Sequence, residues 1–285
     1  MARADRAALL CRWPAHARLV LGAAALAVAA SCASTAEAFT QPPAAAPAPV
    51  GELGLLPGET MAFVVKLAGL EVGEAALAVG ERGAYEGHPA LTVRSKIGTT
   101  GAARLLRAAD DESTTVINLA TGAPLRLDTH VLMGGQETFT KALFAPDHVD
   151  VEVRRTGVAG VRAYTFGAGD GATLDAHAAM AHLRGWRPAR GTSRTVWLVG
   201  GRRLWRVDLA YAGDETIGTE QGNRKATRLD GVAYRAQPDR SLDESKPPRR
   251  FSVWMSDDAD RVPLRVSATT EYGEIELELV DYQRP

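Results

Sequence analysis

Histidines are the side chains in this sequence best suited to acid–base or metal chemistry, and five of them follow the N-terminal leader. His177 and His182 are five positions apart in a predicted helix, so they do not share a face as zinc ligands four positions apart would. His88 and His148 lie in predicted turns, and His130 lies on the polar side of a predicted strand. A surface or turn histidine is the simpler interpretation of each, because none of the spacings is typical of metal ligands.

The other reactive residue types also lack a motif. The sequence contains no Gly-x-Ser-x-Gly nucleophile turn and no glycine-rich loop followed by Lys-Ser/Thr for phosphate. Asp257, Asp258 and Asp260 could supply oxygen ligands to calcium, but a solvated turn is the favoured interpretation. We therefore predict no catalytic residues, no metal and no cofactor, and the sequence favours a protein that is not an enzyme.

Aromatic residues give a stronger indication of a site. Two interpretations stand side by side: an ordinary core, and the walls of a concave cavity for an apolar or amphiphilic ligand, since such sites are built mainly from apolar and aromatic side chains. The segment 184–206 adds many arginines, which could meet anionic lipid headgroups or form a solvated strand face. The candidate ligand-lining residues are Trp186, Trp197, Trp205, Tyr211 and Trp254.

The N-terminus predicts export. A basic start precedes the apolar run 19–30, which is too short to span a bilayer but typical of a signal peptide, so residues 1–38 are assigned to one. Cleavage after Ala36-Glu37-Ala38 would release a soluble periplasmic protein. Alternatively, Ala29-Ala30-Ser31-Cys32 resembles a lipobox, with Ala29 where Leu or Val is expected, and lipidation of Cys32 would anchor the protein at the outer membrane. Residues 39–54 form a Pro/Ala-rich linker.

Alternation of apolar and polar residues predicts the elements that position these side chains. In the C-terminal stretch 251–282, three runs alternate with a period of two, which is typical of an antiparallel meander. Much of the remaining chain follows the same pattern, and an alanine-rich segment near 172–184 predicts a single helix. We expect a mainly β protein, with one domain over 55–285. It would be a large curved antiparallel sheet, or barrel-like β structure, of about a dozen strands.

Composition narrows the classes of partner. The 285 residues carry a net charge of −1 and the two cysteines, Cys11 and Cys32, both lie in the leader. Nucleic acid is therefore not an expected partner, and the folded part is expected to have no disulfide or thiol nucleophile. Contact with a membrane is expected only through a lipid anchor at Cys32.

Several short segments, taken in order, resemble an exported bacterial family called domain of unknown function 3108. The resemblance covers 55–283 and implies a cell-envelope protein, but the family has no established activity and lends no functional residues. The segments are 69–74 (Gly-Leu-Glu-Val-Gly-Glu), 174–184, 222–229 (Gly-Asn-Arg-Lys-Ala-Thr-Arg-Leu), Trp254 with 257–265, and Tyr272-Gly273.

Three functions remain as hypotheses. The leading one is an exported periplasmic or envelope protein that binds a hydrophobic or amphiphilic ligand, such as a lipid, or an envelope protein partner. The second is a structural or assembly protein that acts through its sheet edges or faces. The third is a hydrolase, which requires one of the histidines to meet a Ser or Asp in a pocket.

Overall fold

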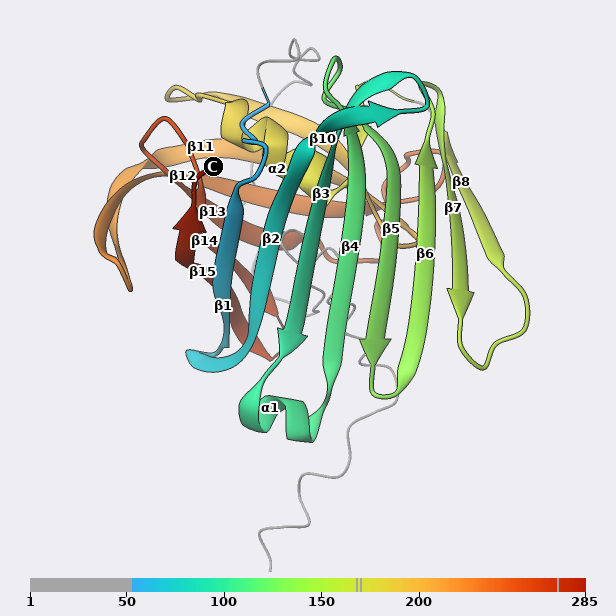
Figure 1. Cartoon of the computed structure of the whole chain (residues 1–285), viewed down its shortest axis with the longest axis horizontal. Coiled ribbons are helices and arrows are strands. Elements are labelled where there is room, and N and C mark those ends of the chain that lie inside the picture. Colours follow the sequence, from blue (N-terminus) through green and yellow to red (C-terminus); the bar gives the residue numbers. More distant parts are fainter. Residues whose placement is uncertain (1–52, 168, 170, 271) are drawn as a thin grey trace, which may run out of the picture.

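The computed structural model describes residues 53–285, apart from 168, 170 and 271 (Figure 1). The predicted signal peptide, Cys32 and nearly all of the predicted linker lie outside these residues. The described strands form one 15-stranded sheet in the order β8-β7-β6-β5-β4-β3-β2-β1-β15-β14-β13-β12-β11-β10-β9. The strands are β1 Thr60–Leu67, β2 Leu70–Tyr85, β3 His88–Thr99, β4 Ala109–Asn118, β5 Pro124–Met133, β6 Gln136–Phe144, β7 His148–Arg155, β8 Arg162–Gly167, β9 Thr173–Leu174, β10 Ser193–Gly200, β11 Arg203–Thr219, β12 Gly222–Ala236, β13 Arg249–Ser256, β14 Pro263–Thr270 and β15 Gly273–Gln283.

The sheet consists of two meanders joined side to side. Strands β1–β8 form the first and β10–β15 the second, and the two halves meet where the first strand β1 pairs with the last strand β15. Every pairing is antiparallel except that of β9 with β10. The sheet curves strongly, so that β11–β14 pass behind the strands of the first meander (Figure 1). The prediction of a mainly β, curved sheet is confirmed, with 15 strands where about a dozen were expected.

Register places the apolar residues on the concave face. Phe251, Val253 and Met255 of β13 are buried, as are Ile275, Leu277 and Leu279 of β15, as their alternation predicted. All six of these side chains belong to one large hydrophobic core. A second, smaller core forms where Val199 and Leu204, on the opposite face of β10 and β11, meet β5–β8. The edge of the second meander is therefore covered on both faces.

The predicted helix is present but shorter than expected. Helix α2 spans Ala176–Gly185, and Thr173–Leu174, which the prediction included, pair with β10 as the short strand β9. Asp175 ends that strand and caps the helix, since its Oδ1 accepts a hydrogen bond from the backbone N–H of Ala178 at 2.9 Å. Seven of the ten helical residues are buried, so α2 lies within the fold against the sheet.

A second helix corrects the prediction of a single one. Helix α1, Gly101–Leu106, joins β3 to β4 at the end of the sheet and buries none of its residues (Figure 1). Six residues give too short an apolar pattern for periodicity to reveal a helix. Within the described part of the chain, no helix has the length and apolar character needed to cross a bilayer.

Candidate functional site: a cavity on the concave face

A cavity of about 200 Å³ lies on the concave face of the sheet, beside helix α2. Much of its wall is apolar and comes from both meanders and the helix. This wall combines Phe63, Leu77, Ile97, Leu127, Met180, Trp205, Val266 and Leu277. Because β1 and β15 pair at the centre of the sheet, residues from the two ends of the described chain meet in this wall.

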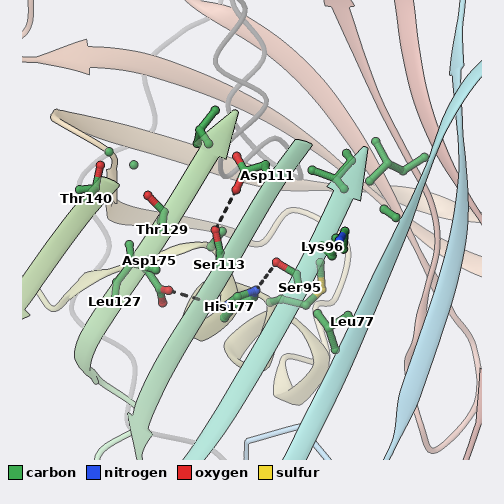
Figure 2. A pocket seen from close by; sticks show the side chains of 18 of the residues that line it. Leu77, Ser95, Lys96, Asp111, Ser113, Leu127, Thr129, Thr140, Asp175 and His177 are labelled. Carbon is green, nitrogen blue, oxygen red and sulfur yellow. Dashed lines mark hydrogen bonds and ion pairs between the residues drawn. The ribbon is translucent and has the colours of Figure 1, made fainter. Parts of the chain in front are cut away.

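A row of hydroxyl groups crosses the same wall, between apolar side chains such as Leu77 and Leu127. Ser95, Ser113, Thr129 and Thr140 are successive cross-strand partners on β3, β4, β5 and β6, so all four side chains point to the same face. All four line the cavity (Figure 2). Among the described residues, no group forms a hydrogen bond with the hydroxyls of Thr129 or Thr140, so both are free to bind a ligand or water.

Asp111, two residues before Ser113 on β4, is the most unusual polar residue of this wall. Its side chain lines the cavity and is only 2% exposed. Ser113 donates to Oδ1 at 3.2 Å, whereas no donor among the described residues reaches Oδ2. Burial raises the pKa of Asp111 to about 7, with the hydrogen bond from Ser113 opposing the shift and the charge of Glu112 adding to it. The carboxyl group is thus close to half ionised at neutral pH and offers an unused oxygen.

His177 connects α2 to the row of hydroxyl groups through Ser95. Its Nε2 lies 2.8 Å from Ser95 Oγ and its Nδ1 lies 2.7 Å from Thr115 Oγ1 (Figure 2 shows the contact with Ser95). Thr115 in turn donates its single hydroxyl hydrogen to Asp175. The Thr115 oxygen must therefore accept from Nδ1–H, which leaves Nε2 as the acceptor of the Ser95 hydroxyl hydrogen. Burial lowers the pKa of His177, partly opposed by the charge of Asp175, so the imidazole is neutral.

The other end of α2 is held by a buried ion pair. Arg184 forms a bidentate pair with Glu59, and neither side chain is exposed. Tyr282 donates its hydroxyl to Glu59 at 3.1 Å, and the backbone oxygen of Asp260 accepts from Arg184. These bonds satisfy both charges inside the protein. The helix that borders the cavity is therefore fixed at both of its ends.

Several arginines also line the cavity. Arg202, Arg203 and Arg249 line it together with Arg155, and no carboxylate of the described residues forms an ion pair with the first three. The guanidinium of Arg249 lies 4.2 Å from the centre of the Trp205 ring. Burial lowers the pKa of Arg203, and burial together with the charges of Arg203 and Arg235 lowers the pKa of Arg249 to about 10. Arg203 and Arg249 therefore stay cationic at neutral pH and have no counter-charge among the residues that the structure describes.

The five aromatic candidates occupy different places. Trp205 lines the cavity. Trp197 lies on the opposite face of β10, where Arg240 stacks on its ring, and Trp186 ends α2 beneath Arg194. Trp254 lies on the outer face of β13 between Arg228 and Arg265, and its Nε1 donates to Glu215 at 2.5 Å. Tyr211 donates its hydroxyl to Asp214 on the same strand. The structure thus brings one of the five into the cavity.

The polar residues of the site were not singled out from the sequence as site residues. His177 is 6% exposed, so the interpretation of it as a surface histidine is wrong. Alternation in the sequence carries part of the signal: Thr92, Arg94 and Lys96 alternate with Leu91, Val93, Ser95 and Ile97, which places Ser95 on the side of the apolar residues. No local pattern could reveal that Ser95 meets a helix 82 positions away.

Carboxylates of the 257–260 turn are engaged in structure. Asp258 accepts hydrogen bonds from Ser256 and from the backbone N–H of Arg261, and it pairs with Arg224 at 3.2 Å. Across residues 53–285, with the gaps given above, no group of three or more His, Cys, Asp or Glu side chains is placed to hold a metal ion.

Comparison with known proteins identifies a family and a fold. The family model described as "Protein of unknown function (DUF3108)" matches residues 62–280. No curated protein matches the chain. Among solved structures, the chain is similar to a β-barrel-like protein of domain of unknown function DUF1849 from Brucella abortus. The two are 10% identical with a TM-score of 0.54, over 80% of this chain and 98% of that one. The hypothetical lipoprotein YmcC from Escherichia coli is 8% identical with a TM-score of 0.28, over 81% of this chain and 86% of that one. At 10% identity, the similarity to the Brucella abortus protein supports the fold alone.

Proposed function

We propose that this chain, which belongs to the protein family of unknown function DUF3108, is an exported protein that binds an amphiphilic ligand in the cavity on its concave face. The observation that carries the proposal is the composition of the cavity wall. Apolar side chains from both meanders line one cavity together with the row of hydroxyls and the arginines Arg202, Arg203 and Arg249. An apolar ligand alone would leave these polar groups unpaired, whereas an amphiphile with an anionic group satisfies both kinds of surface.

Two features support an anionic group on the ligand. Arg203 and Arg249 are partly buried and have no carboxylate partner among the described residues, so each carries a desolvation cost that a bound anion would offset. Guanidinium groups also bind carboxylate and phosphate oxygens in a bidentate geometry. The stacking of Arg249 on Trp205 holds one of these cations against the apolar wall.

Export is supported by the sequence of the leader, with its basic start, its apolar run 19–30 and its alternative processing sites at Ala38 and Cys32. The mass of the mature N-terminus, measured on protein from cell envelopes, separates the two routes. A start at Phe39 identifies a periplasmic protein, and an acylated start at Cys32 identifies a lipoprotein. An uncleaved N-terminus would contradict export by this leader.

Ligand binding is tested with a pair of fluorescent probes that share an apolar body. N-phenyl-1-naphthylamine is neutral, and 1-anilinonaphthalene-8-sulfonate carries an added sulfonate. The purified protein is expected to bind both saturably and to bind the sulfonate more tightly. The double variant Arg203→Gln with Arg249→Gln should bind the sulfonate probe about tenfold more weakly, as expected for loss of a charge-assisted contact. Its affinity for the neutral probe should be unchanged. Thermal unfolding of the variant controls for its fold. Absence of saturable binding of either probe would contradict the proposal.

A second candidate function, serine-dependent ester hydrolysis, is favoured by one observation: the Ser95 hydroxyl donates to a histidine whose other nitrogen is oriented by Thr115 and Asp175. In that chemistry Ser95 Oγ would attack an ester carbonyl carbon and pass its proton to His177 Nε2. The proton would then go to the leaving alkoxide, and water would later release the acyl group. A fluorophosphonate probe tests this candidate. Labelling of the protein that is lost in Ser95→Ala supports it, and absence of labelling rejects it while leaving the binding proposal intact.

A further inference from the structure

Exposed apolar side chains are concentrated at one end of the sheet. Of the six large apolar residues that the described chain exposes, five lie on or directly beside the connections between β1 and β2, β3 and β4, and β7 and β8. We call these five residues the apolar rim: Leu70, Leu105, Leu106, Val158 and Val161, with exposures of 72%, 89%, 89%, 42% and 57%. Leu143, the sixth, lies near the C-terminal end of β6, at the other end of the sheet.

The topology explains why these residues meet. In an antiparallel meander alternate connections fall at the same end of the sheet, so the β1–β2, β3–β4 and β7–β8 connections are together. Figure 1 shows these connections along the lower edge of β1–β8, with α1 projecting below it. Helix α1 places Leu105 and Leu106 at its end and buries none of its residues. No contact among the described residues covers these two adjacent leucines, which points to an external partner.

Charge identifies the kind of partner. The segment 100–109, which contains α1, has Arg104 and Arg107 and no acidic residue. The segment 154–163, which contains the β7–β8 connection, has Arg154, Arg155 and Arg162 and again no acidic residue. Arg104 also forms an ion pair with Asp110 at 2.9 Å, at the start of β4. The apolar tips at α1 and at the β7–β8 connection are therefore flanked by arginines, whereas Leu70 is followed by Glu71. Arginine-flanked apolar tips match the interface of an anionic bilayer, where apolar side chains enter the acyl boundary and cations remain among the headgroups.

We propose that the apolar rim is a docking surface for an anionic lipid bilayer. The shape of the rim favours a fluid lipid layer over a protein partner. Its side chains project from separate connections, and single projecting groups can enter lipid without a complementary surface. The rim is also close to the cavity, since Arg155 at the end of β7 lines the cavity and directly precedes the β7–β8 connection. A protein docked at this rim holds its cavity near the membrane surface.

Vesicle flotation tests the rim. Every protein carries Cys32→Ser, so that no acyl anchor at that position contributes. The parent protein should float with vesicles of phosphatidylcholine and phosphatidylglycerol, and less with phosphatidylcholine alone or at raised salt. Leu105→Ser combined with Leu106→Ser should lower the partition coefficient by about tenfold or more, since two inserted side chains are lost.

Leu143→Ser is the matched control, because it removes an exposed leucine at the opposite end and should leave flotation unchanged. Unfolding temperatures confirm that the variants are folded, as expected for changes at exposed positions. The proposal is overturned if the parent protein does not float with the anionic vesicles. It is also overturned if the double variant floats as the parent does. Neither result depends on whether the cavity binds the naphthalene probes.

Discussion

Ser95 on β3 and His177 on α2 lie 2.8 Å apart, Oγ to Nε2, although 82 positions separate them in the chain. This contact fixes the helix against the sheet and places a serine hydroxyl at the wall of the cavity. Together with the hydrogen bonds of Thr115, it also determines which nitrogen of the imidazole carries the proton. Several measurable properties of the protein depend on this arrangement.

The tautomer of His177 is the first of them. Because Thr115 donates to Asp175, it must accept from Nδ1–H, and Nε2 is left without a proton. Nitrogen-15 NMR of the imidazole at pH 7.5 should therefore show a protonated Nδ1 and an unprotonated Nε2. Thr115→Val removes the acceptor and should abolish this preference. A protonated Nε2 in the parent protein would contradict the hydrogen-bond assignment.

Stability at acid pH should depend on the same histidine. The pKa of His177 is lowered by burial from 6.5. Below pH 6.5 the unfolded chain takes up a proton at this position while the folded protein does not, so the free energy of unfolding falls as the pH drops. Denaturant unfolding between pH 5 and pH 8 should show that the free energy of unfolding falls less at acid pH in His177→Gln than in the parent. Parallel pH profiles would show that burial does not perturb this histidine.

Ionisation of Asp111 should change the stability of the protein with pH in the opposite direction to that of His177. Its folded pKa of about 7 exceeds the ordinary value of 3.8. The unfolded carboxyl ionises first, so this group's contribution to stability is full below pH 3.8 and is lost as the pH rises to 7. Asp111→Asn should gain stability over the parent across that range, by at most about 4 kcal/mol at pH 8. A difference that does not change with pH would contradict the raised pKa.

Removing one partner of the buried Arg184–Glu59 pair should be costly. Arg184→Met leaves the Glu59 carboxylate without its cation inside the protein, and we expect a loss of about 3–5 kcal/mol in the free energy of unfolding. The double variant Arg184→Met with Glu59→Gln should recover part of that loss, because no buried charge is left unpaired. Urea denaturation of the three variants, including Glu59→Gln alone, completes the cycle. Additive losses would mean that the two side chains do not interact.

Two tryptophans provide a matched comparison for the cavity. Trp205 lines it, whereas Trp254 lies on the outer face between Arg228 and Arg265. Trp205→Phe should weaken binding of N-phenyl-1-naphthylamine by roughly fivefold, about 1 kcal/mol of lost apolar contact. Trp254→Phe should leave that binding unchanged. Equal effects of the two substitutions would place the probe elsewhere on the protein.

Alternation in the sequence was sufficient to predict most of the fold. The period of two placed Phe251, Val253 and Met255 on one face, and the structure buries all three. The same signal does not give the strand order, because the pairing of β1 with β15 joins residues more than two hundred positions apart. It also cannot show that β10 and β11 are covered on both faces, which depends on how strongly the sheet curves.

The candidate site was less accessible to prediction. The aromatic pattern found Trp205 but could not separate it from Trp254, since strand alternation defines two faces without saying which one encloses a cavity. The polar strip of Ser95, Ser113, Thr129 and Thr140 is visible only once the register of four strands is known. Small hydroxyl residues at inward positions of successive strands are the signal that could have revealed it.

Native mass spectrometry tests the central claim, that the cavity holds an amphiphile, most directly. The protein is isolated from cell envelopes without detergent and compared with Ala75→Phe, which places a ring in the space beside Leu77 and Ile97. We expect the parent protein to retain one molecule of an anionic amphiphile, which dissociates on activation and is depleted in Ala75→Phe at equal thermal stability. A parent protein without any bound amphiphile, or with the same amount as the filled variant, would contradict the claim.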